Sequence, residues 1–437
     1  MTDATAVIMA AGKGTRMKSD TPKVLHELCG RPLIGWVVAA AQEAGIAKVV
    51  VVDGPDRDLE PALGDAVEIA VQQEAKGTAD AVLSAAEHFG DGPVLVLSGD
   101  VPLLTPEAIR DLLGAHEGAA TMLTMELDDP GELGRVLRDK QGNVERVVEA
   151  KGASSDATPE QLAIREVNTG IYVFDGTLLE DALQRVPTDN AQGEAYLPDA
   201  LVVLREDGRT IAAHVTKDHT VTLGVNDRAD LAAVRAIAQQ RINTGHLRNG
   251  VGIVDPATTY IDVGVAIGQD TRIEPGCTLK TGTTVGANCT IRNAYLDDAT
   301  VEDGVTIGPF AYLRPGTVVR SNAKVGTFVE LKNSDIGAGT KVPHLSYIGD
   351  ADVGENANLA AATITANYDF AAKHRTTIGD RVRTSVDTTL VAPVTLGDDS
   401  YTGAGSVITE DVPAKGLGIA RSRQRNVADY AGRRKER

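Results

Sequence analysis

Residues 261–291 read IDVGVAIGQDTRIEPGCTLKTGTTVGANCTI, with an aliphatic residue at every sixth position. The same spacing runs from Val301 to Leu331 and, after a slip of one residue, resumes at Ile336 and Val342. Neither the 3.6-residue period of a helix nor the alternation of an exposed strand produces this pattern. A hexapeptide repeat does, and it predicts a parallel β-helix whose aliphatic side chains stack from coil to coil.

Composition supports this repeat. The 437 residues include 45 glycines and only 3% aromatic residues, and glycine often follows the ladder aliphatic, as at Gly268 and Gly286. At roughly 18 residues per three-sided coil, residues 250–421 are expected to form about eight or nine coils. Cys277 and Cys289 each lie two residues before a ladder position, so we interpret both as packing residues.

The first 225 residues have a different pattern. Continuous aliphatic runs, typical of parallel strands buried on both faces, occupy residues 6–9, 49–52 and 94–97. Helical segments are expected between them, over residues 33–44, 77–88 and 106–113. This alternation predicts an α/β doubly wound sheet, with ligands beyond the carboxyl ends of its strands. We therefore expect domains at 1–226 and 250–437, joined by a linking helix within 227–249.

Charge and targeting signals limit the classes of function. The 43 Lys and Arg residues against 61 Asp and Glu give a net charge of −18, which disfavours nucleic acid as a partner. The basic end, Arg433 to Arg437, is interpreted as a solvated tail. The sequence shows neither a secretory signal nor an apolar run of about 18 residues, so no membrane span is expected. Three cysteines without a CxxC motif favour a cytoplasmic location.

A glycine-rich loop follows the first predicted strand. Residues 10–17 read AAGKGTRM, in which glycines let backbone N–H groups approach a phosphate while Lys13 and Arg16 supply charge. The loop lacks both the GK[ST] ending of a Walker loop and the third glycine of GxGxxG. Taken alone, it could be a simple turn between strand and helix. Lys23 follows closely and offers a further cation.

AAGKGTRM followed by PKVLH at 22–26 resembles the signature of sugar-1-phosphate nucleotidyltransferases. With the hexapeptides, nearly the whole chain is similar to the bacterial bifunctional UDP-N-acetylglucosamine pyrophosphorylases and glucosamine-1-phosphate N-acetyltransferases. Further motifs appear in order: Gln72, Gly77-Thr78, SGDVPL at 98–103, Gly134-Arg135, Val148-Glu149, NTG at 168–170, NAQGE at 190–194 and GVN at 224–226. The resemblance implies a Rossmann-like nucleotidyltransferase domain and a left-handed β-helix in an enzyme of UDP-N-acetylglucosamine and cell-wall synthesis.

The first reaction implied by the resemblance is uridylyl transfer from UTP to N-acetylglucosamine 1-phosphate. Because several negative charges meet, such a site must supply cations and positioning. Arg16 and Lys23 would neutralise phosphates, and Asp100 and Asn226 would hold Mg²⁺, which prefers oxygen ligands. The nucleotide would be held by Met9, Ala10, Ala11, Gly12, Lys23, Gln72, Gly77, Thr78, Ser98, Gly99 and Asp100. The sugar would be bound by Gly134, Glu149 and Asn168.

The second implied reaction is acetyl transfer from acetyl-CoA to glucosamine 1-phosphate, in a homotrimer. His344 would be the general base, a role suited to an imidazole because this group titrates near neutral pH. Sugar phosphate would be bound by Arg314, Lys332, Tyr347, Asn358, Asn367 and Tyr368, and acetyl-CoA by Ala361, Ala404 and Arg421. Four segments interrupt the hexapeptide rhythm with such side chains, at 313–316, 328–332, 343–347 and 367–369, and we expect them to be loops or surface positions.

The chain departs from the family pattern at several positions. It has Ala360-Ala361-Ala362 and Ser385-Val386 where the family shows glycines and a Gly-Ser pair, Phe370 in place of a glycine, and Leu133 in place of an aromatic residue. An alternative hypothesis is therefore a uridylyltransferase whose β-helix serves only as a trimerisation scaffold. A non-catalytic sensor of nucleotide sugars is less favoured, because a sensor would not need the metal pair.

Overall fold

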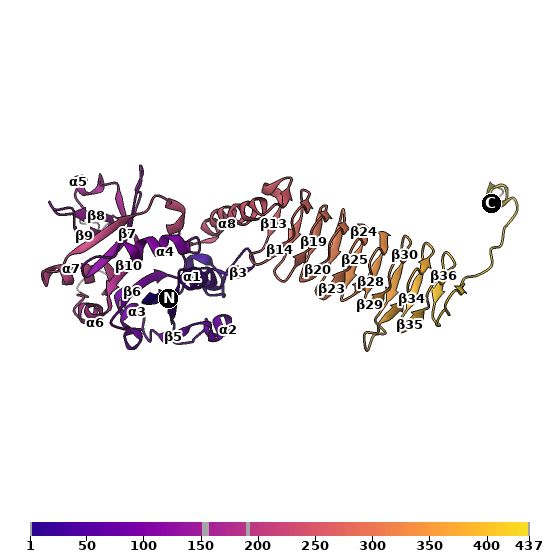
Figure 1. Cartoon of the computed structure of the whole chain (residues 1–437), viewed down its shortest axis with the longest axis horizontal. Coiled ribbons are helices and arrows are strands. Elements are labelled where there is room, and N and C mark those ends of the chain that lie inside the picture. Colours follow the sequence, from indigo (N-terminus) through magenta and orange to yellow (C-terminus); the bar gives the residue numbers. More distant parts are fainter. Residues whose placement is uncertain (1, 151–156, 189–192, 436–437) are drawn as a thin grey trace. The chain divides into compact units, whose positions relative to one another are not determined.

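The computed structural model describes residues 2–150, 157–188 and 193–435. The first three residues of the motif at 190–194 therefore lie outside the described residues. The chain divides into two compact units, Met1–Ala238 and Gln239–Arg437, and each is described here by itself. Figure 1 shows the mixed helices and strands of the first unit and the stacked strands of the second.

The first unit is built on a mixed sheet with the strand order β11-β7-β10-β6-β1-β4-β5. These strands are β1 Thr2–Met9, β4 Ile46–Asp53, β5 Glu68–Val71, β6 Pro93–Ser98, β7 Ala120–Glu126, β10 Glu166–Asp175 and β11 Ile211–Val215. The three predicted strands are confirmed as β1, β4 and β6, and β1 runs parallel to both neighbours. Strand β10 is antiparallel to β6 and β7. The hairpin β8 Arg135–Arg138 and β9 Val144–Val148 extends from β10.

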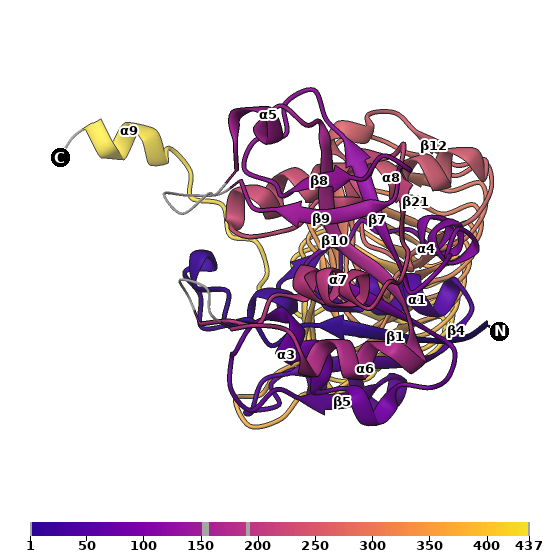
Figure 2. The same ribbon diagram turned by 90° about the vertical axis from the view of Figure 1, so that its left-hand side faces the viewer.

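Helices cover both faces of this sheet (Figure 2). On one face α1 Leu33–Glu43 and α4 Pro106–Gly114 pack against Ile8 and Leu97. On the other face lie α3 Thr78–Leu83, α6 Gly176–Gln184 and α7 Leu197–Glu206. The doubly wound architecture is thus confirmed.

The helix predicted over 77–88 is shorter than expected. It stops after Leu83, and a 3₁₀ turn follows at Ala86–His88. The Ser84 hydroxyl donates to the Asp80 carbonyl at 2.9 Å, a local bond of the kind that competes with continuation of a helix. Shorter elements are η1 Thr15–Met17, η2 Lys23–Leu25, β2 Glu27–Leu28, β3 Arg31–Pro32, α2 Glu60–Leu63, η3 Gly64–Ala66, α5 Pro159–Leu162 and η5 His219–Thr222.

The second unit is a parallel β-helix of three sheets with 10, 9 and 8 strands. The β12 sheet contains β12 Gly252–Ile253, β15 Arg272–Ile273, β18 Thr290–Ile291, β21 Thr306–Ile307, β24 Lys324–Thr327, β27 Lys341–His344, β30 Asn358–Leu359, β33 Arg383–Thr384, β36 Tyr401–Thr402 and β38 Leu417–Gly418. The β13 sheet contains β13 Tyr260–Ile261, β16 Thr278–Leu279, β19 Ala294–Leu296, β22 Ala311–Leu313, β25 Glu330–Lys332, β28 Tyr347–Gly349, β31 Ile364–Ala366, β34 Thr389–Val391 and β37 Val407–Ile408. The β14 sheet contains β14 Ala266–Ile267, β17 Thr284–Val285, β20 Ala299–Val301, β23 Thr317–Val319, β26 Asp335–Ile336, β29 Ala351–Val353, β32 Thr376–Ile378 and β35 Val394–Leu396.

The hexapeptide ladder forms the core of this β-helix. Ile261, Leu331 and Ile348 are completely buried, and Cys277 and Cys289 are buried beside the ladder. The one-residue slip in the ladder corresponds to a coil of 17 residues, as between the paired Val318 and Asp335. The turn in this coil is one residue shorter, so the aliphatic side chains still point into the core.

Of the four segments expected to be loops or surface positions, three keep the register of the β-helix and carry their functional side chains at its surface. Leu313, Leu331, Val342 and Ile348 remain buried ladder residues in β22, β25, β27 and β28. The functional side chains stand on the outward positions of regular strands. Only the fourth segment is an insertion: paired residues Ala351 and Thr376 are 25 positions apart, whereas Asp335 and Asp352 are 17 apart. The extra residues form the loop at 367–375.

The predicted linking helix is confirmed as α8 Arg228–Arg248, and the boundary between the two units falls within it. The domain limits at 226 and 249 stay predictions. A short turn, η6 Pro256–Thr258, lies between the first two β-helix strands, and α9 Tyr430–Lys435 carries the exposed Arg433 and Arg434. Arg437 lies outside the described residues. In the described part of the chain, no helix has the length and apolar character needed to cross a membrane.

Candidate active sites

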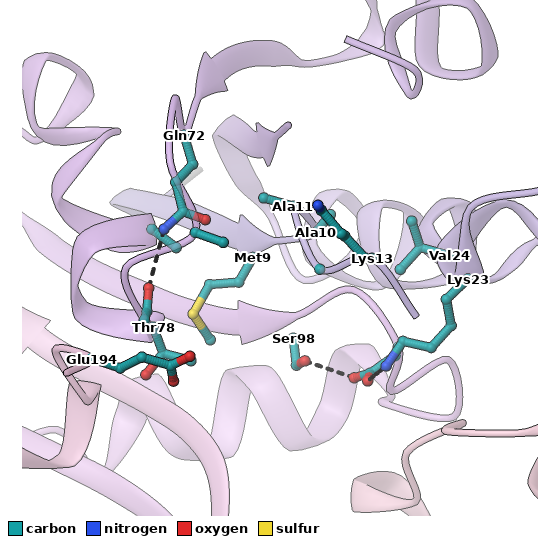
Figure 3. Close-up of a pocket in the computed structure, with 15 residues that line it drawn as sticks. Met9, Ala10, Ala11, Lys13, Lys23, Val24, Gln72, Thr78, Ser98 and Glu194 are labelled. Carbon is teal, nitrogen blue, oxygen red and sulfur yellow. Dashed lines mark hydrogen bonds and ion pairs between the residues drawn. The ribbon is translucent and has the colours of Figure 1, made fainter. Parts of the chain in front are cut away.

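A pocket of about 280 Å³ opens beyond the carboxyl ends of β1 and β6 (Figure 3). Its lining contains ten of the residues predicted from the sequence to hold the nucleotide: Met9, Ala10, Ala11, Gly12, Lys23, Gln72, Gly77, Thr78, Ser98 and Asp100. Gly99 is not in the lining; its N–H donates to the Met9 carbonyl at 2.9 Å. The site assignment missed Lys13, Val24, Ala75, Ala81 and Glu194. Three of these carried a signal, because Lys13 lies in the glycine-rich loop, Val24 in the motif at 22–26 and Glu194 in the motif at 190–194.

Two glycines of this loop have different structural roles. Gly14 has φ +56°, and a Cβ there would lie 2.4 Å from the Lys23 Cβ. It therefore allows η1 and η2 to approach each other. A Cβ added to Gly12 would meet no atom within 4 Å. The space beside Gly12 leaves its backbone open to a ligand, as phosphate binding by backbone N–H groups requires.

Two cation–oxygen pairs lie close together in the fold, and the residues of the first line the pocket whereas Arg16 and Asn226 of the second are not in its lining. Lys23 Nζ is 2.5 Å from Asp100 Oδ2, and the Ser98 hydroxyl donates to Asp100 Oδ1 at 2.6 Å. Arg16 donates to Asn226 Oδ1 at 2.7 Å. A backbone bond from Val225 N–H to the Asp100 carbonyl, 2.9 Å long, connects the two pairs. The topology thus joins residues that lie more than 200 positions apart in the sequence.

The donor set of these pairs fits a magnesium ion. Asp100 offers a carboxylate and Asn226 an amide oxygen, both hard ligands of the type that Mg²⁺ takes together with substrate phosphates. Both oxygens already face positively charged nitrogens. A cation is therefore compatible with this position, and Asp100 and Asn226 are the residues that could hold it.

Gln72 is held in one orientation at the far side of the pocket. Its side chain is buried, and Nε2 donates to Asp80 Oδ2 at 2.7 Å and to the Gly77 carbonyl at 3.2 Å. Gly77 itself has φ +112°, and a Cβ there would lie 2.3 Å from the Ala195 carbonyl oxygen. Because the amide nitrogen of Gln72 already donates to two acceptors, Oε1 is the atom that can accept a hydrogen bond from a nucleobase.

The residues predicted to bind the sugar come together at β8, β9 and β10. The Gly134 carbonyl accepts the Asn168 N–H at 2.9 Å, and a Cβ on Gly134 would lie 3.5 Å from Glu149 Oε1. Asn168 Oδ1 accepts from Gly170 N–H at 3.0 Å and from the Tyr172 hydroxyl at 2.9 Å. Burial raises the pKa of Tyr172 far above its ordinary value, so it stays a neutral donor. Asn168 thus keeps its amide nitrogen as a donor for a ligand.

On the β-helix, the register of the β13 sheet assembles a second group of polar residues. Arg314 follows β22 and Lys332 ends β25 on the neighbouring coil. Arg314 is 2.9 Å from Glu330, and Lys332 is 2.9 Å from Asp350. Asn367, at the start of the inserted loop, donates to the Tyr347 hydroxyl at 3.4 Å. Tyr368 lies in the same loop and is half exposed.

His344 lies on the adjacent β12 sheet, across the turn at Leu345. A line of backbone bonds runs from it along the coils: Ala362 N–H to the His344 carbonyl, Asp387 N–H to that of Ala361, and Gly405 N–H to that of Val386. Arg421 donates to the Ala404 carbonyl at 2.8 Å. The residues predicted to bind acetyl-CoA, Ala361, Ala404 and Arg421, therefore follow one line that begins at the predicted base.

Asn358 does not join this group. It is in register with Lys341 and Arg383, three positions before Ala361 on the β12 sheet. The sequence assignment also missed Lys373, in the inserted loop. The Lys332 ammonium beside it lowers the pKa of Lys373. Its position in the longest insertion among the described coils of the β-helix was a signal that could have indicated it.

Comparison with known proteins identifies the family of this chain. Residues 6–155 match the family described as MobA-like NTP transferase domain. The chain is 46% identical over 466 residues to the bifunctional protein GlmU of Mycolicibacterium vanbaalenii, covering 100% of this chain and 94% of that protein. The chain belongs to the GlmU family. The GlmU proteins of Streptomyces avermitilis and Brevibacillus brevis are 48% and 46% identical, over 99% and 98% of this chain and 95% and 97% of theirs.

Membership of the GlmU family confirms the resemblance seen in the sequence. The protein is a bifunctional transferase, a uridylyltransferase and acetyltransferase of UDP-N-acetylglucosamine synthesis. Its substrates accordingly include a nucleotide and acetyl-CoA.

Proposed function

We propose that the two reactions are divided between the two sites: uridylyl transfer in the pocket beyond β1 and β6, and acetyl transfer on the β-helix at His344. The observation that supports this division most directly is the paired arrangement of Lys23 with Asp100 and Arg16 with Asn226, close together in the fold. It brings cations and hard oxygen ligands to one place, as phosphate chemistry requires.

In uridylyl transfer, a phosphate oxygen of N-acetylglucosamine 1-phosphate attacks the α-phosphorus of UTP, and pyrophosphate leaves. Arg16 and Lys23 neutralise the phosphates, and the backbone at Gly12 approaches them closely. Asp100 and Asn226 hold Mg²⁺, which when bound supplies further positive charge to the phosphates. Gln72 Oε1 accepts a hydrogen bond from the base, and the Asn168 amide donates to the sugar.

In acetyl transfer, the amine of glucosamine 1-phosphate attacks the thioester carbonyl carbon of acetyl-CoA. His344 takes the amine proton, the C–S bond breaks, and the thiol of CoA leaves with a proton. Arg314 and Lys332 bind the phosphate of the sugar, together with Tyr347, Asn367 and Tyr368. The coenzyme follows the line from Ala361 past Ala404 to Arg421.

We also propose that the protein is a homotrimer. Phe310, Phe328 and Leu345 occupy the same turn of successive coils and are 54%, 57% and 59% exposed. The two rings stack with centroids 5.2 Å apart. This apolar ridge suits contact with a second copy of the chain. Asn358 is separate from the other predicted sugar-phosphate residues within one chain, and a second copy could bring its own Asn358 to them. Phe328→Asp should lower the mass measured by sedimentation equilibrium to that of a monomer, and an unchanged mass would contradict the proposal.

We place the enzyme in the cytoplasm. The buried thiols Cys277 and Cys289 are of the kind kept reduced there.

One experiment tests the division of activities. CoA release from acetyl-CoA with glucosamine 1-phosphate is measured beside Mg²⁺-dependent pyrophosphate release from UTP with N-acetylglucosamine 1-phosphate. His344→Ala should abolish only the first activity, and Asp100→Ala only the second. If wild-type protein released pyrophosphate but no CoA, the β-helix would be a scaffold, as in the alternative hypothesis.

A further inference from the structure

We propose that Asp350 is a positioning residue of the acetyl-transfer site, which holds Lys332 and Asn367 in the geometry that binds the sugar phosphate. The inference rests on the proposed function of these two residues. Asp350 follows β28 at the turn toward β29 and was not among the residues predicted from the sequence. It acts through its neighbours and is not itself expected to touch the substrate.

Three side chains from two separate segments, Lys332-Asn333 and the inserted loop, converge on this one carboxylate. Lys332 Nζ lies 2.9 Å from Oδ2 and 3.2 Å from Oδ1. Asn333 Nδ2 donates to Oδ1 at 2.8 Å, and Asn367 Nδ2 donates to Oδ2 at 2.5 Å. Asp350 is only 5% exposed and Asn367 is also buried, whereas Lys332 is partly exposed and Asn333 is exposed. The carboxylate therefore lies below the surface at which Lys332 is accessible.

Only an ionised carboxylate satisfies this arrangement. All three partners donate, and a carboxylate is an acceptor on both oxygens. An amide at the same position would direct two N–H groups at other donors. Burial alone would raise the pKa of Asp350, but the bonds from Asn333, Lys332 and Asn367 hold this pKa below its ordinary value. The Asp350 carboxylate is therefore charged at neutral pH.

The backbone of Asp350 also forms hydrogen bonds to the coil of Lys332 and to the end of the inserted loop. Its N–H donates to the Lys332 carbonyl at 2.9 Å, and its carbonyl accepts the Thr376 N–H at 3.1 Å. Asn367 and Thr376 lie at the two ends of the inserted loop, which also carries Tyr368 and Lys373. Asp350 thus connects the regular coil that presents Lys332 with both ends of the insertion.

Asp262 provides a matched control on another coil of the same β-helix. It is also buried, at 8% exposure, and lies 2.8 Å from Lys280. It accepts the Thr281 N–H at 3.1 Å. None of the residues assigned to the acetyl-transfer site bonds to it in the described structure. Replacement of Asp262 therefore reports the structural effect of removing a buried carboxylate.

The test compares Asp350→Asn with Asp262→Asn in the full-length protein. Asp350→Asn should raise the KM for glucosamine 1-phosphate about 10- to 100-fold, since bonds to two binding side chains are lost. The KM for acetyl-CoA and the rate of uridylyl transfer should stay unchanged. Asp262→Asn should shift the urea midpoint of the β-helix without changing either KM. If both variants had the same kinetic constants, Asp350 would be only structural and the proposal would be wrong.

Two measurements separate this proposal from the function on which it rests. In a double-mutant cycle, Asp350→Asn combined with Asn367→Ala should raise the KM by less than the product of the single effects, because both remove the same bond. Calorimetric binding of glucosamine 1-phosphate does not require acetyl transfer. If wild-type protein binds glucosamine 1-phosphate and Asp350→Asn binds it more weakly, the positioning role is supported. This holds even if the β-helix has no acetyltransferase activity. Equal binding by both, or binding by neither, would overturn it.

Discussion

The two sites differ in how the chain brings their residues together. Arg16 and Asn226 contact each other across 210 positions, through the topology of a seven-strand path in a mixed sheet. Arg314 and Glu330 contact each other across 16 positions, because neighbouring coils here repeat every 18 residues and Glu330 is paired with Tyr312, two residues before Arg314. In the β-helix, the number of residues between two side chains indicates whether they are neighbours on adjacent coils. In the α/β unit, which side chains are neighbours follows only from the tertiary fold. Changes in the two regions should therefore have separable effects.

The largest expected effect is at Lys23. Lys23→Met removes a phosphate-binding cation and the partner of Asp100, so uridylyl transfer should fall about 10²- to 10³-fold. Acetyl transfer should be unaffected, because its residues lie in another unit. Steady-state assays of both activities measure this. Lys140→Met, on an exposed turn, is the control and should change neither rate. A loss of acetyl transfer in Lys23→Met would contradict the independence of the regions.

The stability of the β-helix should depend on its ladder. Leu331→Ala empties a fully buried position and should lower the free energy of unfolding by about 2–5 kcal/mol. Acetyl transfer should be lost at lower urea concentrations, while uridylyl transfer keeps its urea dependence. Lys324→Ala, at an exposed position of β24, should shift neither curve. Loss of both activities at one urea concentration would indicate that the two units unfold together.

Glycine substitutions should distinguish folding from binding within the nucleotide pocket. Gly77→Ala forces a Cβ against the Ala195 carbonyl at φ +112° and should destabilise the unit by about 1–3 kcal/mol. Gly12→Ala meets no neighbouring atom, so stability should change by less than about 0.5 kcal/mol. Its KM for UTP should nevertheless rise about tenfold, because the methyl group occupies the approach to the backbone. An unchanged KM would mean that phosphates bind elsewhere in the pocket.

The smallest expected effect is at Val386, which lies between Ala361 and Ala404 along the proposed coenzyme line. It is 52% exposed, so a serine fits there without a clash. Val386→Ser adds a hydroxyl near the acetyl group and should raise acetyl transfer about two- to tenfold, the range of one hydrogen bond. Val407→Ser, which is similarly exposed on β37, should leave the rate unchanged. A decrease in Val386→Ser would show that the position favours an apolar side chain.

The ladder from Ile261 onward was sufficient to predict the β-helix, because each coil contacts only its neighbours and its period is written directly in the sequence. Aliphatic runs were likewise sufficient for β1, β4 and β6. The antiparallel placement of β10 was not predicted, since strand direction depends on the connections and not on the composition of the strand. The glycine-rich loop indicated residues 10–13 of the nucleotide pocket, and the family resemblance indicated most of the others. Glu194 lies in the quoted motif at 190–194, but nothing local to that motif showed that it would line the pocket.

The sequence alone determined the repeat, the strands and the identity of the residues that carry charge or accept protons. Only the tertiary structure decided which of the four segments are regular strands and that the segment at 367–375 is inserted. It also decided that Gln72 meets Asp80 and that Lys332 meets Asp350. A periodic pattern records which residues are buried, because burial selects apolar side chains at fixed intervals. The partner of a buried polar side chain is set by turns and insertions, whose geometry leaves no period in the sequence.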